Sequence, residues 1–295
     1  MNPICILYAS LDDGASLPRR SKAILNWKEK NIPMLANRDL EEPSLFTPEN
    51  LLREARRQKS IPNRQVPRVC LLDPDGDVVR YLIREGRATL NPNWACYHTE
   101  MYDFLLGNTT AGIVGNAVGS PFAVLVAEEM FVSGCRLLLS LTSAGKIDEQ
   151  ADLPRFLVIS KALRDEGTSD HYVERGGSCL LNSALLKTLI AALDNSPVPL
   201  GLGTSWTTDA PFRETAAAVR RMLKLGADCV EMEAAALYAF AQARGKDVIC
   251  IAHVTNSMAR SEGDFEKGAE NGSVDSLTVI EFLLRVLKRT RYRNG

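Results

Sequence analysis

The stretch GADCVEMEAAALYAF, residues 226–240, indicates the fold class because its apolar pattern changes within a few residues. The segment DCVEM is typical of a short buried strand, and the alanine-rich residues 234–244 predict a helix. Glu231 and Glu233 fall at the junction, where at least one of the two side chains should point into a packed interior. Burying a carboxylate is costly unless something hydrogen-bonds to it. The junction therefore needs hydrogen-bond donors for at least one of these acids.

The same alternation of short apolar runs and helical stretches extends along most of the chain. The apolar runs are RVCLLD, VVRYLI, AGIVGNAVG, CRLLLSLT, RFLVIS, VPLGLGTSW, DCVEM and DVICIAHVTN, and helical stretches span residues 121–133, 183–193, 211–225 and 234–244. Strands that alternate with helices predict an α/β fold in three layers, with a mainly parallel central sheet and helices on both faces. Ligands of such sheets bind beyond the carboxyl ends of the strands.

The first part of the chain has a different pattern, which is helical and richer in charge. The segment TPENLLREARRQK begins with Thr47 as an expected N-cap and Pro48 at the first helical position. The following SIPNRQVP is typical of a linker. We therefore expect a helical N-terminal extension, residues 1–65, followed by an α/β domain, residues 66–295.

Composition limits the classes of partner. The chain has 295 residues with 35 basic and 36 acidic side chains, so neither nucleic acid nor a membrane surface is expected as a partner. No apolar run of about 18 residues is present, and the seven cysteines lie mostly in apolar runs, which favours a cytoplasmic protein with reduced thiols. The His, Cys and carboxylate spacings predict no metal site, and no dinucleotide-binding glycine motif follows a strand.

Four segments at or near the expected strand ends carry a family resemblance. They are VGSPFAVLVAEEM, LLLSLTSAG, RDEGTSDHY and VEMEAAALYAFA. In order and spacing, residues 66–284 resemble the nucleoside phosphorylases of the uridine phosphorylase and hexameric purine nucleoside phosphorylase type, whose relatives include the methylthioadenosine nucleosidases. The resemblance is closest in look to uridine phosphorylase. It implies that the α/β domain is catalytic and cleaves the N-ribosidic bond of a nucleoside.

The resemblance also implies how the sugar is held. Glu233 would accept hydrogen bonds from the 2′- and 3′-hydroxyls of ribose, and Met232 would lie under the sugar. A carboxylate suits a vicinal diol because each oxygen can accept one hydroxyl. A fixed anion beside the sugar also stabilises the positive charge that develops as the glycosidic bond breaks. Glu231 should face elsewhere, as an acid at the helix start.

On the base side, purine-specific members carry an aspartate where this chain has Asn256. An amide can donate a hydrogen bond to a pyrimidine carbonyl but cannot deliver a proton, so the substitution favours a uridine-like substrate. Phe212 would stack on the base and Arg213 would bind its carbonyls, with Trp206 and Tyr172 as further candidates. Each of these side chains has an ordinary structural role as its alternative.

The chain departs from the family where phosphate is bound. Two arginines expected within the subunit are replaced by Gly76 and Ser140, and a third, supplied by a neighbouring subunit, aligns near His98. The turn LDPDGD is instead acidic and would repel phosphate.

Three hypotheses about the reaction follow from this departure. In the first, the leading expectation, which the likeness to uridine phosphorylase favours, a phosphorylase transfers ribose to phosphate as co-substrate. In the second, which the missing arginines favour, a nucleosidase uses water that a carboxylate activates. In the third, a nucleoside-binding protein has kept the sugar pocket and lost the chemistry. No cofactor is expected in any of them, and the family's shared sites imply a homo-oligomer, from dimer to hexamer. The phosphate candidates are Gly119, Thr142, Ser143 and His98, helped by Arg80 or Arg87, and the candidate bases are Asp73, Asp75 and Glu129.

Overall fold

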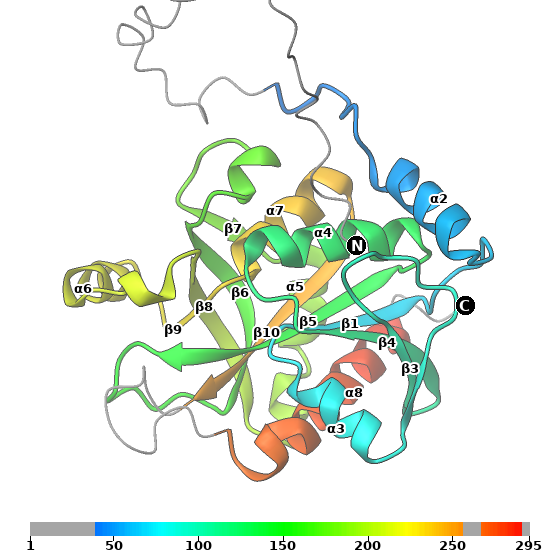
Figure 1. The fold of residues 1–295 in the computed structure, drawn as a ribbon. Helices are drawn as coiled ribbons and strands as arrows, with labels where there is room; N and C mark the ends of the chain where they lie inside the picture. Colours follow the sequence, from blue (N-terminus) through cyan, green and yellow to red (C-terminus); the bar gives the residue numbers. More distant parts are fainter. Residues whose placement is uncertain (1–38, 256–266, 291–295) are drawn as a thin grey trace, which may run out of the picture. The chain divides into compact units, whose positions relative to one another are not determined.

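The computed structural model describes residues 39–255 and 267–290 (Figure 1). Most of the predicted N-terminal extension, residues 1–38, lies outside the described residues, and so does the candidate base-binding residue Asn256. The expected helix after Thr47 is confirmed as α2 (Pro48–Lys59), and the Thr47 hydroxyl accepts the Asn50 N–H at 3.3 Å. This helix packs on α4 (Ser120–Val132).

The central sheet has ten strands in the described chain. They are β1 (Val69–Asp73), β2 (Ala88–Leu90), β3 (Tyr102–Leu106), β4 (Thr109–Gly115), β5 (Leu137–Lys146), β6 (Phe156–Asp165), β7 (Ser178–Leu180), β8 (Leu200–Thr208), β9 (Cys229–Glu231) and β10 (Asp247–Thr255). Their order is β10-β6-β8-β9-β5-β1-β4-β3-β2, with β7 beside β6 and a further pairing of β10 with β5. The longest registers, β5 with β10 and β6 with β8, are parallel, as predicted.

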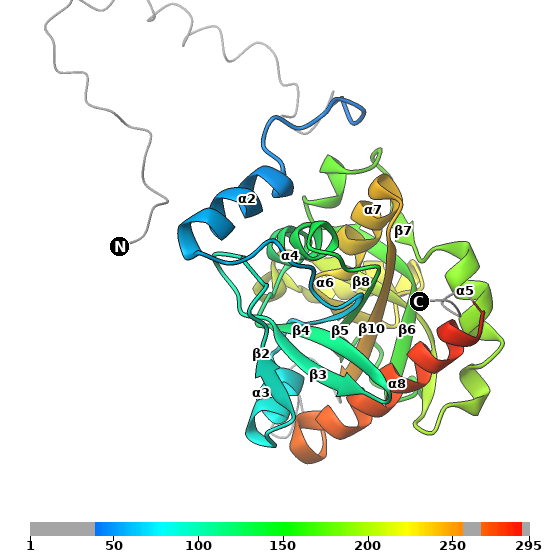
Figure 2. The same ribbon diagram turned by 90° about the vertical axis from the view of Figure 1, so that its right-hand side faces the viewer.

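Helices cover both faces of the sheet. Figure 1 shows α4 and α7 (Ala234–Arg244) on one side, with α3 (Asp77–Arg84) and α8 (Ser273–Thr290) on the other. In Figure 2, α5 (Ser183–Ile190) lies beside α8, and α2 lies outside α4. Helix α6 (Ala216–Lys224) packs against β8 and β9, where Val219 and Met222 share a buried cluster with Trp206 and Val230. The predicted α/β fold, with helices on both faces of the sheet, is therefore confirmed.

One predicted strand is wrong. The run VVRYLI forms helix α3, and its buried residues Val78, Val79 and Leu82 recur at helical rather than alternate spacing. Gly76, with φ of +74°, caps this helix and turns the chain out of β1. Short apolar runs do not separate strand from helix, and the β-branched residues favoured the strand. Strands β2 and β7, of three residues each, and β3 were not predicted.

The strand order brings several loops to one edge of the sheet. Strands β1 and β4 end together, with Asp73 beside Gly115, and β10 runs parallel to β5 as far as Thr255 beside Gly145. Strand β9 runs antiparallel to β5, with Val230 beside Gly145, so the chain after Val230 passes back along Ser143 and Thr142. The candidate sugar and phosphate segments therefore meet at this edge.

Among the described residues, no helix is both long and apolar enough to cross a membrane.

Candidate active site

Glu231 holds the start of helix α7. Its Oε2 accepts the backbone N–H groups of Glu233 and Ala234, both at 2.7 Å, and its Oε1 accepts the Thr207 hydroxyl at 2.5 Å. The side chain is buried, and burial raises its pKa. Because the first N–H groups of a helix have no partner within it, these bonds both satisfy Glu231 and fix the helix start. The expectation that Glu231 is a helix-start acid is confirmed.

Glu233 is held differently, with one oxygen left over. Its Oε1 accepts the Gly119 N–H at 2.7 Å, whereas its buried Oε2 has no hydrogen-bond partner among the described residues. Burial, followed by the charge of Glu231, raises the pKa of Glu233 to about 8. The Gly119 N–H and the Thr142 hydroxyl act in the opposite direction. Buried polar atoms are almost always hydrogen-bonded, so this oxygen is a candidate acceptor for a donor that the chain itself does not supply.

The residues around Glu233 form a close junction between two helix starts. The Ser120 hydroxyl donates to the Met232 carbonyl at 2.7 Å, which ties α4 to the start of α7. Gly119, at φ of +89°, lets the chain turn so that its N–H faces Glu233. Met232 is half-buried beside them. The structure therefore brings Gly119, Met232 and Glu233 together, as the resemblance implies.

The acidic turn after β1 is built on a buried aspartate. Asp73 Oδ2 accepts the Val79 N–H at 2.9 Å at the start of α3, and burial raises the pKa of Asp73 to about 7. At Gly76 an added Cβ would lie 2.3 Å from Asn116 Oδ1 and 2.5 Å from Arg80 Nη1. Any side chain at this position would have to displace the Asn116 and Arg80 side chains and adopt a positive φ, which disfavours the arginine that the family resemblance implies there. The turn after β1 is therefore built around a glycine at the position where the resemblance implies an arginine.

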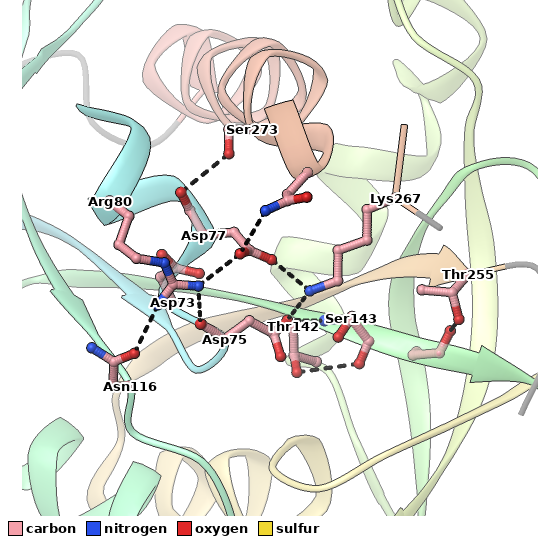
Figure 3. Close-up of polar contacts among 12 residues, drawn as sticks. Asp73, Asp75, Asp77, Arg80, Asn116, Thr142, Ser143, Thr255, Lys267 and Ser273 are labelled. Atoms are coloured by element: carbon pink, nitrogen blue, oxygen red, sulfur yellow. Dashed lines mark hydrogen bonds and ion pairs between the residues drawn. The ribbon is translucent and has the colours of Figure 1, made fainter. Parts of the chain in front are cut away.

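Asp75 reaches across from this turn to the loop at Ser143 (Figure 3). Its Oδ2 accepts the Ser143 N–H at 2.7 Å and lies 3.3 Å from Lys267 Nζ. Lys267 also donates to Asp77 Oδ2 at 2.6 Å. The Ser143 N–H, a candidate phosphate donor, is thus occupied by a carboxylate of the same chain. Lys267 was not predicted, because nothing in the sequence connects it with a turn 190 residues away.

The other candidates for binding phosphate or water do not all lie beside Asp75 and Ser143. The Thr142 side chain is buried near Glu233, whereas Arg80 binds Asp77 and the Asp75 carbonyl. Arg87 stacks on Tyr81 instead. Two more candidates lie along α4. Glu129 is part of the helix, both of its carboxylate oxygens are buried, and burial raises its pKa. His98 is exposed and packs edge-on against Phe122.

The candidate base-binding residues are spread over two places. Trp206 and Arg213 line a hollow of about 370 Å³ between β8 and α6, and the Trp206 indole donates to Asp165 at 2.9 Å. Side chains alternate along a strand, so the hollow lies on the opposite face of β8 from Thr207, which binds Glu231. Phe212 is 99% exposed beside the hollow.

Tyr172 lies elsewhere, along the second half of α7. Its hydroxyl donates to Glu128 at 3.1 Å, and its ring contacts Phe240 and Arg244. Glu233 lies at the other end of that helix.

In the described ranges, no group of three or more His, Cys, Asp or Glu residues could hold a metal ion.

Comparisons with known proteins agree on one family. A model of the phosphorylase superfamily matches residues 68–288. Guanosine phosphorylase from Halorubrum lacusprofundi is 23% identical over 55% of this chain and 66% of its own length. A DeoD-type purine nucleoside phosphorylase from Shewanella oneidensis is 25% identical over 51% of this chain. That match spans 64% of the relative's length, so each match spans slightly less than two thirds of the relative.

Solved structures show the same fold at low identity. Uridine phosphorylase from Vibrio fischeri superposes with a TM-score of 0.62 and 22% identity over 76% of this chain and 94% of its own. A 5′-methylthioadenosine/S-adenosyl homocysteine nucleosidase from Campylobacter jejuni gives 0.60 and 16% over 76% and 100%. The matched family segment contains the paired helix starts, the Glu231–Glu233 junction and the acidic turn. The chain therefore belongs to the phosphorylase superfamily.

Proposed function

We propose that the protein is a nucleosidase, which cleaves the N-ribosidic bond of a nucleoside with water as the acceptor. The observation that carries this proposal is the Asp75 carboxylate on the Ser143 N–H, at 2.7 Å. An anionic co-substrate would have to displace this carboxylate and approach the neighbouring carboxylate of Asp77. Like charges at such distances disfavour binding, whereas water meets no such barrier.

Glu233 would hold the sugar. Its free Oε2 and its Gly119-bonded Oε1 can both accept a hydroxyl of the ribose diol, since a carboxylate oxygen has two lone pairs. Hydrogen bonds to the ionised form favour ionisation, so a bound ribose would lower the raised pKa of Glu233. The resulting anion would stabilise the cationic sugar as the C1′–N bond breaks.

Asp75 would take the proton of the attacking water. Of the three candidate carboxylates it is the one that contacts the Ser143 loop, whereas Asp73 caps α3 and Glu129 lies within α4. The water oxygen bonds to C1′, the C1′–N bond breaks, and the electron pair leaves with the base. The base then takes up a proton, and free ribose results.

The identity of the base is a separate proposal. Asn256 favours a pyrimidine-like base. Arg213 and Phe212, in the η4 turn (Pro211–Arg213), lie at the hollow on the other face of β8 from Thr207, so this structure does not support their part in base binding. The relatives named above act on guanosine, other purine nucleosides or uridine, so the panel of test substrates must include both classes. A homo-oligomer stays a prediction, and light scattering of the purified protein measures it.

Phosphorolysis is the second candidate. It is favoured by the names of three relatives, which are phosphorylases, and by two cations, Lys267 and Arg80, close to the Ser143 loop. The non-catalytic nucleoside-binding hypothesis is the third, and it requires only that Glu233 binds the sugar.

One experiment separates the three. Purified protein is incubated with purine and pyrimidine nucleosides in H₂¹⁸O, with and without phosphate, and the sugar product is identified by mass. We expect ribose that carries one ¹⁸O atom at equal rates in both conditions. Ribose 1-phosphate that forms only with phosphate would refute the hydrolase proposal. Nucleoside binding without any product would support the third hypothesis instead.

A further inference from the structure

The Asp75 carboxylate lies where two donors of this chain could hold an anion. We infer that this single side chain selects water over phosphate, and that its removal opens a phosphate site in the protein. The inference rests on the proposed function, because it names the residue that determines the acceptor. Its physical basis is the set of donors that now face Asp75.

Two donors converge on one oxygen of Asp75. The Ser143 N–H and Lys267 Nζ lie 2.7 and 3.3 Å from Oδ2, and the Lys267 side chain is only 16% exposed (Figure 3). A backbone N–H beside a partly buried ammonium is a strong arrangement for an anionic oxygen. Without the Asp75 carboxylate, the Ser143 N–H would have to find another acceptor.

The site adjoins the group that would hold the sugar. Glu233 is 2% exposed, and its unpartnered Oε2 marks a place where a ligand belongs. Strand β9 runs antiparallel to β5 with Val230 beside Gly145, so the chain that leads to Glu233 returns towards Ser143, whose N–H binds Asp75. Thr142, next to Ser143, acts on the Glu233 carboxylate. An anion on Ser143 would therefore lie close to the bond that breaks.

The turn does not depend on the Asp75 side chain for its shape. Arg80 donates to the Asp75 carbonyl at 2.8 Å, and the Gly76 N–H donates to the Asp73 carbonyl at 2.9 Å. Lys267 remains anchored by Asp77 at 2.6 Å. Truncation at position 75 thus leaves the donors in place, and Lys267 and Arg80 then share the single carboxylate of Asp77.

The test is phosphate binding to Asp75→Ala, measured by isothermal titration with inorganic phosphate and no nucleoside. We expect binding at least about tenfold tighter than in the wild type, the factor that one charge-assisted hydrogen bond supplies. Asp77→Asn is the matched control, because it also removes one negative charge from the cluster but leaves Asp75 on Ser143. It should gain no affinity. Thermal unfolding confirms that each variant is folded.

Two further variants distinguish the effect of the space left by Asp75 from the effect of removing its charge. Asp75→Asn keeps the volume and an acceptor for the Ser143 N–H, so it should gain less affinity than Asp75→Ala. Adding Lys267→Ala to Asp75→Ala should abolish the gain. Folded Asp75→Ala that binds phosphate no better than the wild type or Asp77→Asn would overturn the inference.

Turnover provides the second readout. With phosphate, Asp75→Ala should form ribose 1-phosphate: a phosphate oxygen bonds to C1′, the C1′–N bond breaks, and the departing base takes the proton of hydrogen phosphate. Its hydrolysis should fall about 100-fold or more with the loss of the proton acceptor. If the variant gains phosphate binding but neither protein cleaves a nucleoside, the proposed function fails while the anion site stands. Cleavage by hydrolysis alone, with no gained phosphate affinity, would reject the inference and keep the function.

Discussion

Replacing Glu233 by glutamine tests the sugar site with a minimal change in shape. In Glu233→Gln the amide oxygen can still accept the Gly119 N–H, now 2.7 Å from Oε1. The other terminal atom becomes an NH₂ group, which donates and cannot accept a ribose hydroxyl. The variant therefore keeps the junction between α4 and α7 and loses the free acceptor, Oε2.

The expected loss follows from the hydrogen bonds that change. A hydrogen bond to a charged group contributes about 1.5–3 kcal/mol, and the diol makes two of them with an ionised carboxylate. One bond is lost outright and the other loses its charge, which totals about 3 kcal/mol. At about 1.4 kcal/mol per factor of ten, kcat/KM should fall on the order of a hundredfold.

The assay compares a ribonucleoside with its 2′,3′-dideoxy analogue in both proteins. The loss should appear with the ribonucleoside and nearly vanish with the analogue, which has no hydroxyls for Glu233 to bind. Because burial raises the pKa of Glu233 to about 8, wild-type kcat/KM for the ribonucleoside should rise as pH increases towards 8. The glutamine variant should not show this rise of kcat/KM with pH. An equal loss with both substrates, or a loss below about threefold, would refute the sugar assignment.

Three further predictions concern the residues that build the site. Glu231→Ala leaves two N–H groups of α7 and the Thr207 hydroxyl without their acceptor, so urea denaturation should show a loss of about 2–4 kcal/mol. Gly76→Ala should cost at least about 1 kcal/mol more than Gly86→Ala, since both have positive φ but only position 76 is crowded; equal costs would contradict this. The folded pKa of Asp73, about 7, lies above its ordinary 3.8, so its stabilising contribution is complete at low pH and is lost as pH rises through 7. Relative to Asp73→Asn, wild-type thermal stability should fall between about pH 4 and 7 and then level off.

The sequence predicted the parts of the fold that follow from local pattern. The strand-to-helix change at residues 229–244 is found as β9 and α7, and the start and end of α7 agree with the prediction. The alternation of elements placed the polar loops at one edge of the sheet, where Glu233 and Ser143 indeed lie. The strand prediction for the run VVRYLI was wrong, because the helix there depends on the turn at Gly76 and on burial against other elements rather than on helix propensity.

Long-range partners could not be predicted in the same way. The acidity of the Asp73–Asp77 turn was evident, but the contact of Asp75 with Ser143 depends on how β1 and β5 are paired. Lys267 follows β10 in the chain, and only the folded sheet brings it to the turn. Trp206 and Arg213 could be placed at a strand end, but the side of β8 that they face depends on register.

The two glutamates of the VEME segment show how the fold separates structure from binding. Glu231 uses both oxygens on donors of the chain itself and so fixes the start of α7. That start places Glu233 where a single N–H, from Gly119, meets it and one oxygen remains free. Burying two acids this close raises the pKa of both, a cost that a purely structural junction would avoid with one acid. The unsatisfied oxygen of Glu233 is the atom that the proposed ribose contact would use, which is the reason to test ribosides first.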